Sequence, residues 1–372
     1  MMTLAMRNLF QSKVHLLISV GGVSLALMII LAFDAIFTGV EGQLAAYIDH
    51  SRADVFVSQA GVRNMHMVAS WLPASVVGRV RAVQGVQEAT PILYLTGMVV
   101  ARGNRNIAYV IGLPPRATVG TPWRIADGAP IPGHGQAVID RGVAARSGLG
   151  LGAMVTILGR PYRVSGLSEG TASLVNSVAF ISFGDFARAR GNAPVVSFVL
   201  VRVRPGTSVA TVVARIGAQV PGVTVQSRQT FGAQERQLVQ DMDADVITIM
   251  NLVGLLTGLA VLALTVYTAT LARRAEYGVL KALGTRNGQL YRVVMAQACG
   301  SAVLGFVLAL AGTLLLSQAV SWSGSTLALQ VSGASLVKVG ALTLLIATGA
   351  AILPILQVTR LDPATVFRGG IQ

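Results

Sequence analysis

The stretch LLISVGGVSLALMIILAFDAIF, residues 16–37, is almost wholly apolar and holds a single charged residue, Asp34. A helix rises about 1.5 Å per residue, so roughly 20 such residues cross the hydrocarbon core of a bilayer. Three further stretches have the same character, at residues 246–271, 293–320 and 337–358. The sequence therefore predicts an integral membrane protein with four transmembrane helices.

The spacing of these four stretches is uneven, because about 200 residues separate the first from the second. A segment of that length is far longer than an ordinary loop and can bury a core of its own. We therefore expect an α+β membrane protein in a 1+3 arrangement. One helix precedes a large folded domain outside the membrane, and three helices follow it.

The composition agrees with a chain that lies largely in lipid, since 53% of its residues are hydrophobic, 12% are charged and the mean hydropathy is +0.65. The formal net charge of +14 raises the question of nucleic-acid binding. However, only three of the 29 basic residues are lysines, and no basic run is interleaved with aromatic residues. We expect no nucleic-acid partner.

Basic residues next to the four stretches indicate the orientation of the chain, because short loops rich in Lys and Arg stay in the cytoplasm. They lie before the first stretch, between the second and third, and after the fourth: Arg7, Lys13, Arg273, Arg274, Lys281, Arg286, Arg292, Arg360 and Arg368. Both termini are therefore expected in the cytoplasm and the large domain outside. The first stretch is too long for the apolar core of a signal peptide, so we expect a retained anchor.

Helical periodicity continues past the first stretch and resumes ahead of the second, which predicts two stalk helices outside the membrane. The alternative is a pair of solvated helix ends. The chain then divides into an N-terminus with first span and stalk (1–51), an outer domain (52–230), a stalk with the second span (231–272), a cytoplasmic connection (273–292), a third span (293–320), a short outer loop (321–336), and a fourth span with the C-terminus (337–372).

The outer domain contains a weak internal repeat of strand, helix and strand. One copy runs from residue 54 to residue 100, and the other starts at residue 195. Two such units can form a split β-α-β sandwich of ferredoxin-like type, here the porter part. Between them we expect an inserted β-rich subdomain at about 116–190, in which 154–158 and 162–167 predict a β-hairpin.

No constellation of catalytic or metal-binding residues is visible in the sequence. A P-loop needs a Lys followed by Ser or Thr, whereas Lys13, Lys281 and Lys338 are followed by Val, Ala and Val. The four histidines are dispersed, and the single cysteine, Cys299, lies within the third span. We expect no catalytic residue, cofactor or metal on this chain. Asp34 is either a functional charge in the membrane or a side chain that reaches the interface.

The cytoplasmic connection contains the segment RRAEYGVLKALG, residues 273–284, which has the pattern of a short two-faced helix. Val279 and Leu283 share one face, and Gly284 stands where a helix end needs a positive φ. Two interpretations are open. The segment is either an interfacial helix anchored by basic residues or a helix shaped to insert into a groove of a cytoplasmic partner.

Four places in the chain resemble the FtsX-like permeases, which are subunits of MacB-type (type VII) bacterial ABC transporters. They are Leu4–Leu9 before the first span, Asp54–Gly61 at the start of the outer domain, Arg274–Gly284, and the C-terminal Pro354 with Asp362-Pro363-Ala364 through Arg368. The resemblance covers essentially the whole chain. Within the family, the sequence is most similar to the branch of the heterocyst glycolipid exporter permease (DevC-like).

The resemblance implies a dimer of four-span protomers, identical or related, in the bacterial cytoplasmic (inner) membrane. Two copies of an ABC ATPase that binds ATP and Mg would dock on the cytoplasmic side. Because the sequence begins shortly before its first span, we expect this ATPase on a separate polypeptide. The implied coupling residues are Arg273, Arg274, Glu276, Tyr277, Val279, Leu280, Leu283 and Gly284. A membrane-fusion adaptor or another extracytoplasmic protein, and membrane lipids, are further expected partners.

These expectations combine into a permease that works by mechanotransmission and exports or extracts a lipid, glycolipid, lipoprotein or peptide. The alternative is a transmembrane signal transmitter that activates an extracytoplasmic partner such as a cell-wall hydrolase. Charge reversal at Glu276, or Leu280→Asp, is expected to uncouple ATP hydrolysis from transport without preventing membrane insertion.

Overall fold

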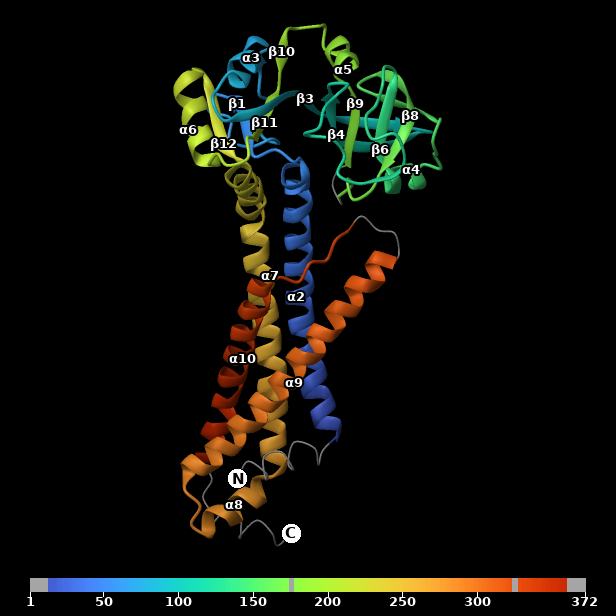
Figure 1. Ribbon diagram of the computed structural model, residues 1–372. Helices are drawn as coiled ribbons and strands as arrows, with labels where there is room; N and C mark the ends of the chain where they lie inside the picture. The colour runs from blue at the N-terminus through green and yellow to red at the C-terminus, as the bar shows by residue number, and fades with distance from the viewer. Residues whose placement is uncertain (1–12, 174–176, 323–326, 360–372) are drawn as a thin grey trace. The chain divides into compact units, whose positions relative to one another are not determined.

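The computed structural model describes residues 13–173, 177–322 and 327–359, which form two compact units (Figure 1). The helical unit takes residues up to 38, most of the chain from 243 onward, and the fourth long helix. The sheet unit takes residues 39–242 and a short segment ending at Ala328. The motifs at Leu4–Leu9 and Asp362–Arg368 lie outside the described residues.

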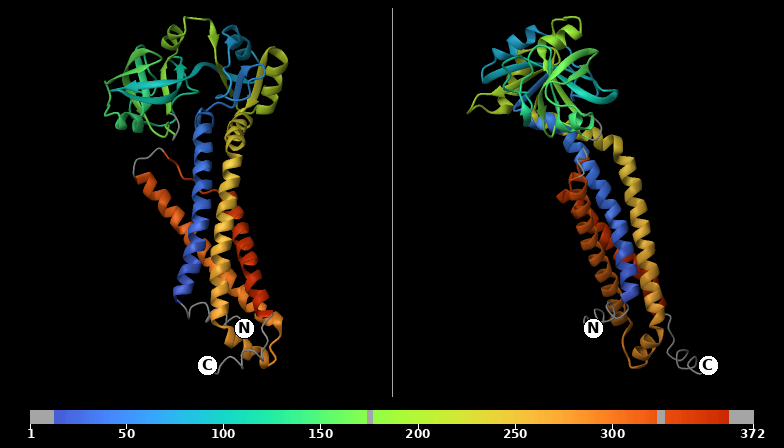
Figure 2. Two further views of the ribbon diagram at one scale, coloured as in Figure 1. Left: turned by 180° about the vertical axis from the view of Figure 1, so that it is seen from behind. Right: turned by 90° about the vertical axis from the view of Figure 1, so that its right-hand side faces the viewer.

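The helical unit is built from long apolar helices. Within the described part of the chain, four helices are long and apolar enough to cross a membrane, as the sequence predicts. They are α2 (Lys13–His50), α7 (Arg228–Ala272), α9 (Asn287–Trp322) and α10 (Gly333–Thr359). In the back view of Figure 2, α9 is inclined to the other three. The first turns of α7 and the last turns of α2 belong to the sheet unit.

Small residues let α2 and α7 approach each other closely. A Cβ added to Gly22 of α2 would lie 2.3 Å from Val261 Cγ1, and one added to Gly254 of α7 would lie 2.4 Å from Ile30 Cγ1. Near the same contact, Ser19 and Thr265 share a hydrogen bond of 2.8 Å between their hydroxyls. In lipid, such close packing and interhelical hydrogen bonds replace the hydrophobic effect as the forces that hold helices together.

The charge of Asp34 on α2 is paired rather than isolated. Its Oδ1 forms an ion pair with Nζ of Lys338 on α10, and its side chain is nearly buried. Lys338 is partly exposed. From the sequence, Asp34 was expected to be either a functional charge in the membrane or a side chain that reaches the interface. In the structure, Lys338 neutralises its charge, as a nearly buried carboxylate requires.

The first half of the sheet unit has the strand order of a ferredoxin-like sandwich. Its strands are β1 (Val55–Gln59), β3 (Val86–Ala101), β11 (Phe198–Val203) and β12 (Val223–Ser227), arranged β12-β1-β11-β3 and all antiparallel. The crossover helices are α3 (Ser75–Arg81) and α6 (Val209–Gln219). Each half of the predicted repeat therefore supplies two strands and one helix, and the two halves interleave in one sheet.

The two faces of this sheet have different coverings. One face packs on α3 and α6 through small aliphatic side chains: Val55, Val57, Val76, Val80, Val199, Val201, Val212 and Ile216. The other face carries Phe56, Phe198 and Leu200, which pack in one cluster with residues of the helix ends, Tyr47 and Ile48 of α2 and Phe231 of α7. Both faces are buried, so the strands read as nearly continuous apolar runs.

The second half of the sheet unit is a small closed barrel. Strand β3 pairs in turn with β4 (Asn104–Leu113), then β9 (Ser177–Ser182), β6 (Gln136–Asp140), β8 (Arg160–Ser168) and β7 (Met154–Ile157), and β7 pairs back with β3. Its interior is filled by side chains, which include Val99, Val110, Ile139, Val155, Ile157, Tyr162, Val164, Ile181 and Phe186. Closure removes free strand edges from this part of the sheet.

The predicted hairpin is present in the structure, whereas the barrel begins earlier in the chain than the predicted insertion. Strands β7 and β8 are antiparallel, and the turn between them has positive φ at Leu158 and Gly159, as a tight hairpin needs. The expected start of the insertion near residue 116 is too late, because β4 and the second half of β3 already belong to the barrel. Strand β3 is 16 residues long and belongs both to the ferredoxin-like half and to the barrel. The prediction treated these two parts as built from separate strands.

Shorter elements complete the sheet unit. Strand β5 (Ile125–Gly128) pairs with β8, and β2 (Leu72–Pro73) pairs with β10 (Val195–Val196). Helix α4 (Arg141–Arg146) begins where the Asp140 carboxylate accepts a hydrogen bond from the Gly142 N–H, and α5 (Phe183–Ala189) begins where the Ser182 hydroxyl accepts one from the Asp185 N–H. These two caps fix the helices that lie against the barrel.

We expect the Asp34–Lys338 pair to stabilise the helical unit. Asp34→Ala or Lys338→Ala leaves one charge unpaired, and should lower the free energy of unfolding by on the order of 2 kcal/mol, between the values for exposed and buried pairs. Thermal unfolding of the full chain in detergent measures this. The double variant Asp34→Asn/Lys338→Gln, which removes both charges, should recover most of the loss; an equal loss in the double variant would contradict the pairing.

Candidate functional site

The predicted cytoplasmic connection forms helix α8 (Arg274–Ala282), which α7 precedes by a single residue. That residue, Arg273, has φ −108° and ψ 20°, so the chain changes direction between the two helices. Tyr277 and Gly278 are buried, Tyr277 with 3% exposure, and Leu280 packs against the core of the helical unit. These side chains anchor α8 to the helices that would lie in the membrane.

The opposite face of α8 is open. Glu276 and Val279 are exposed, and Leu283, which directly follows the helix, has 79% of its side chain exposed. Positions three and four apart lie on one side of a helix, so these residues share a face. The result is the two-faced helix that the sequence predicts, with an acidic group beside an exposed apolar pair.

The end of α8 is fixed by backbone hydrogen bonds that form a Schellman motif. The Thr285 N–H donates to the Leu280 carbonyl and the Gly284 N–H to the Lys281 carbonyl, both at 3.0 Å. Gly284 has φ +88°, which an L side chain adopts only with strain. In addition, Nζ of Lys281 donates to the Thr359 carbonyl at the end of α10, at 2.9 Å. The exposed face is therefore held on a fixed support.

The eight residues expected to couple the chain to an ATPase fall into two groups. Arg274, Glu276, Val279, Leu283 and Gly284 are exposed, whereas Arg273 and Leu280 are partly buried and Tyr277 is buried. The sequence pattern separates Val279 and Leu283 from the rest, but it does not show that Tyr277 faces the core. The structure thus brings an exposed group together, and assigns Tyr277 and Leu280 to holding the helix in place.

A second set of candidate residues joins the helix ends to the ferredoxin-like sheet. Phe231 on α7 is fully buried, with its ring stacked on Phe56 of β1 at 4.7 Å between centroids and set edge-on to Phe198 of β11 at 5.9 Å. The Arg228 N–H, at the start of α7, donates to the Asp54 carbonyl at 2.9 Å. α7 therefore begins directly against the central strands of the sheet.

Glu235, one turn further along α7, is a buried carboxylate with 1% exposure. Its Oε2 accepts a hydrogen bond of 2.7 Å from the Met65 N–H, and its Oε1 contacts Nδ1 of His66, whose ring lies 4.1 Å from that of Tyr109. Glu235 is not predicted from the sequence. The only available signal is an acidic residue within the helical stripe that starts at Phe231, and nothing local identifies its partner, which is 169 residues away.

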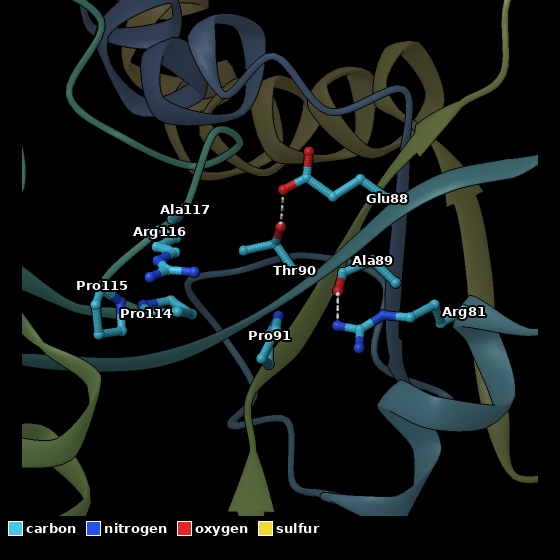
Figure 3. Close-up of a pocket in the computed structure, with 9 residues that line it drawn as sticks. All are labelled: Arg81, Glu88, Ala89, Thr90, Pro91, Pro114, Pro115, Arg116 and Ala117. Carbon is cyan, nitrogen blue, oxygen red and sulfur yellow. Dashed lines mark hydrogen bonds between the residues drawn. The ribbon is translucent and has the colours of Figure 1, made fainter.

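A pocket of about 360 Å³ lies where the first half of β3 faces the loop at 114–117 (Figure 3). On that edge, Nη2 of Arg81 donates to the Ala89 carbonyl at 3.1 Å, and Pro91 has no N–H to offer. Burial opposes ionisation of Glu88, but hydrogen bonds from Thr118 and Thr90 and the nearby Arg202 outweigh it and lower the pKa of Glu88. Arg81 and Glu88 are thus bonded within the protein, and the Arg81 hydrogen bond together with Pro91 reduces the free pairing groups on this strand edge.

Titratable side chains do not gather into a metal site in the described ranges. No group of three or more His, Cys, Asp or Glu residues there is placed to hold a metal ion. The His66–Glu235 pair and the contact of His134 with Asp185 each bring together one histidine and one carboxylate. These pairs hold loops and helix starts in place.

Comparisons with known proteins assign the chain to a family. Residues 16–219 match the family model of the MacB-like periplasmic core domain, and residues 248–363 match that of the FtsX-like permease C-terminal domain. The chain therefore belongs to the MacB-type, FtsX-like permeases of ABC transporters. It is a multi-pass membrane protein, and the family implies an ABC ATPase partner and dimerisation. Permease components of this kind are generally non-catalytic.

Two solved structures are similar to part of the chain. The periplasmic region of MacB from Actinobacillus actinomycetemcomitans is 12% identical, with a TM-score of 0.40, and the match covers 50% of this chain and 92% of that one. The extracellular domain of the noncanonic ABC-type transporter YknZ from Gram-positive bacteria is also 12% identical, with a TM-score of 0.37 and coverage of 47% and 99%. No curated protein matches the sequence. The branch within the family stays a prediction.

The two faces of α8 should respond differently to substitution. Tyr277→Ala removes a buried aromatic ring and should lower the free energy of unfolding by about 3 kcal/mol. Leu283→Ser changes an exposed side chain and should alter it by less than about 0.5 kcal/mol. Thermal unfolding of both variants in the same detergent compares them. An equal loss in the two variants would show that the assigned faces are wrong.

Glu235→Gln tests the link between α7 and the loop that carries Met65 and His66. The substitution removes the negative charge that His66 contacts, and should lower the free energy of unfolding by roughly 1–3 kcal/mol and speed hydrogen exchange at Met65. Glu169→Gln is the matched control, because Glu169 contacts Arg124 and Arg141 at the surface. It should be nearly neutral. Unchanged exchange at Met65 in Glu235→Gln would remove Glu235 from this role.

Proposed function

We propose that the chain is a permease subunit that works by mechanotransmission. A separate ATPase moves α8, and α7 carries that movement to the sheet unit. The observation that supports this most directly is the span of α7, which is one helix from Arg228 to Ala272. Its first two turns hold Phe231 and Glu235, and its last residue is separated from α8 only by Arg273.

The exposed face of α8 supports a docking role for this helix. An apolar group of Val279 and Leu283 beside the carboxylate of Glu276 suits a groove on a partner, since helix-in-groove recognition uses apolar side chains at this spacing. ATP and Mg are assigned to the partner ATPase, because the chain has no Lys followed by Ser or Thr. Two ATPase copies would meet two permease protomers, identical or related.

A mechanical role needs firm contacts at both ends of the moving element. At the sheet, the ring of Phe231 is buried between Phe56 and Phe198, so a shift of α7 must either move β1 and β11 or break apolar contacts. At α8, the buried ring of Tyr277 and the hydrogen bond from Nζ of Lys281 to the Thr359 carbonyl hold the helix against its neighbours. Packed interfaces of this kind transmit movement because they are bistable rather than deformable.

The cargo and the site of action belong to the same proposal. We assign the chain to the bacterial cytoplasmic membrane with both termini inside, since the connection that contains α8 is rich in basic residues. Movement of an outer domain suits cargo taken at the outer face: a lipid, glycolipid, lipoprotein or peptide. The second candidate is a signal transmitter that activates an extracytoplasmic partner such as a cell-wall hydrolase; the same mechanical path supports it, without a cargo.

The experiment that tests this proposal measures docking and transmission separately. Glu276→Lys and Leu283→Asp should each weaken ATPase binding by roughly tenfold or more, the effect of losing about 1.4 kcal/mol, because both change the exposed face only. Leu280→Asp is unsuitable, because Leu280 packs against the core and its replacement would disturb folding. Gln289→Lys, an exposed position in the first turn of α9, is the matched charge control.

Transmission is read as an ATP-dependent change in distance between spin labels on the sheet units of the two protomers. A label at Gln219, exposed on α6, in a Cys299→Ser background gives one site per chain. The parent and Gln289→Lys should show the change, and the two α8 variants should lose it. Normal ATPase binding and a normal distance change in both α8 variants would refute the assignment of α8.

A further inference from the structure

The outside of the barrel carries an apolar patch that no element covers within residues 13–173, 177–322 and 327–359. In the register of the strands, Met98 on β3 lies beside Ile107 on β4, and Val100 lies between Arg105 on β4 and Thr156 on β7. Met154 on β7 lies beside Arg163 on β8. Directly paired residues point to the same face of a sheet, so these side chains form one surface across four neighbouring strands. We call it the barrel patch.

The apolar members of the barrel patch are unusually accessible. Met98, Ile107 and Met154 have 46%, 50% and 57% of their surface exposed, whereas their neighbours Val99, Ala108 and Val155 point into the barrel and are buried. Along each strand, exposed patch residues therefore alternate with buried core residues, as in any strand with one solvated face. The exposed positions, however, hold large apolar side chains where polar ones are usual. Contiguous exposed apolar surface of this kind marks an interaction site.

Arginines border the barrel patch, and no acidic residue occurs in it. Arg105 on one side and Arg163 on the other are exposed, and the part of the chain that the structure describes provides neither with an ion-pair partner. The surrounding domain shares this bias: residues 52–230 contain 18 arginines, no lysine and six acidic residues. Methionine and arginine are enriched at protein interfaces, and lysine and carboxylates are depleted there.

Charge complementarity indicates what covers the patch. A second copy of this chain would place arginines against arginines around the apolar centre, and like charges across an interface are costly. Ligand sites for small molecules are concave, whereas an exposed sheet face of this kind suits burial face to face against a protein surface. We propose that the barrel patch docks a different protein, on the same side of the membrane, whose contact surface has an apolar centre edged by carboxylates.

This inference goes beyond the proposed function and does not depend on it, because an exporter and a signal transmitter could both use such a partner. The test uses the full chain in its own membranes. A photo-reactive benzoylphenylalanine at position 107 should yield a discrete cross-linked product with a second polypeptide, identified by mass spectrometry. The double charge reversal Arg105→Glu/Arg163→Glu should lower the yield at least tenfold.

Arg79→Glu/Arg204→Glu is the matched control, because both arginines are exposed on the ferredoxin-like half. It should leave the yield unchanged, and both double variants should keep the thermal midpoint of the parent. Raised salt should lower the yield from the parent, since exposed charge pairs are screened. A product that is a dimer of this chain, a lipid adduct, no product at position 107, or a yield that charge reversal does not change would each overturn the proposal.

Discussion

The aromatic contact of Phe231 with Phe56 and Phe198 is the interaction on which the proposed mechanism depends. It joins the first turns of α7 to strands β1 and β11, which come from the two halves of the internal repeat. Tyr47 and Ile48, at the end of α2, enter the same cluster. Because apolar burial is non-directional, such a cluster would allow sliding by itself. The hydrogen bonds at Asp54 and Met65 give it a defined register.

Much of the fold can be predicted from the sequence, because its main elements have strong periodic signals. The long apolar stretches predict the membrane helices, and the strand-helix-strand repeat predicts the ferredoxin-like half. Gly159-Arg160-Pro161 between two apolar runs predicts the hairpin of β7 and β8, although the turn itself is Leu158 and Gly159 and β8 already begins at Arg160. Closure of the barrel cannot be predicted in this way, because the pairing of β7 with β3 joins residues more than 50 positions apart and leaves no local pattern.

In the candidate site, too, the features set by local sequence can be predicted, and those set by contacts between distant residues cannot. Spacing alone separates Val279 and Leu283 from the other face of α8, and it identifies Gly284 as the end of the helix, since both properties are local. The buried position of Tyr277 and the partners of Glu235 and Asp34 depend on residues distant in the chain. A carboxylate in an apolar helical stripe indicates that it needs a hydrogen-bond or ion-pair partner, but the sequence does not show which residue that partner is. The family assignment adds the ATPase and the second protomer, which no residue pattern by itself supplies.

The 16-residue strand β3 has a consequence for how the sheet unit can be re-engineered. Its first half pairs with β11 in the ferredoxin-like sheet, and its second half pairs with β4 and β7 in the barrel. The two modules thus share a stretch of backbone, without a linker between them. A chimaera that grafts the barrel of a homologue onto this chain has to be spliced within a hydrogen-bonded strand, near Ile92 and Leu93, and must keep the alternation of side chains in phase across the junction.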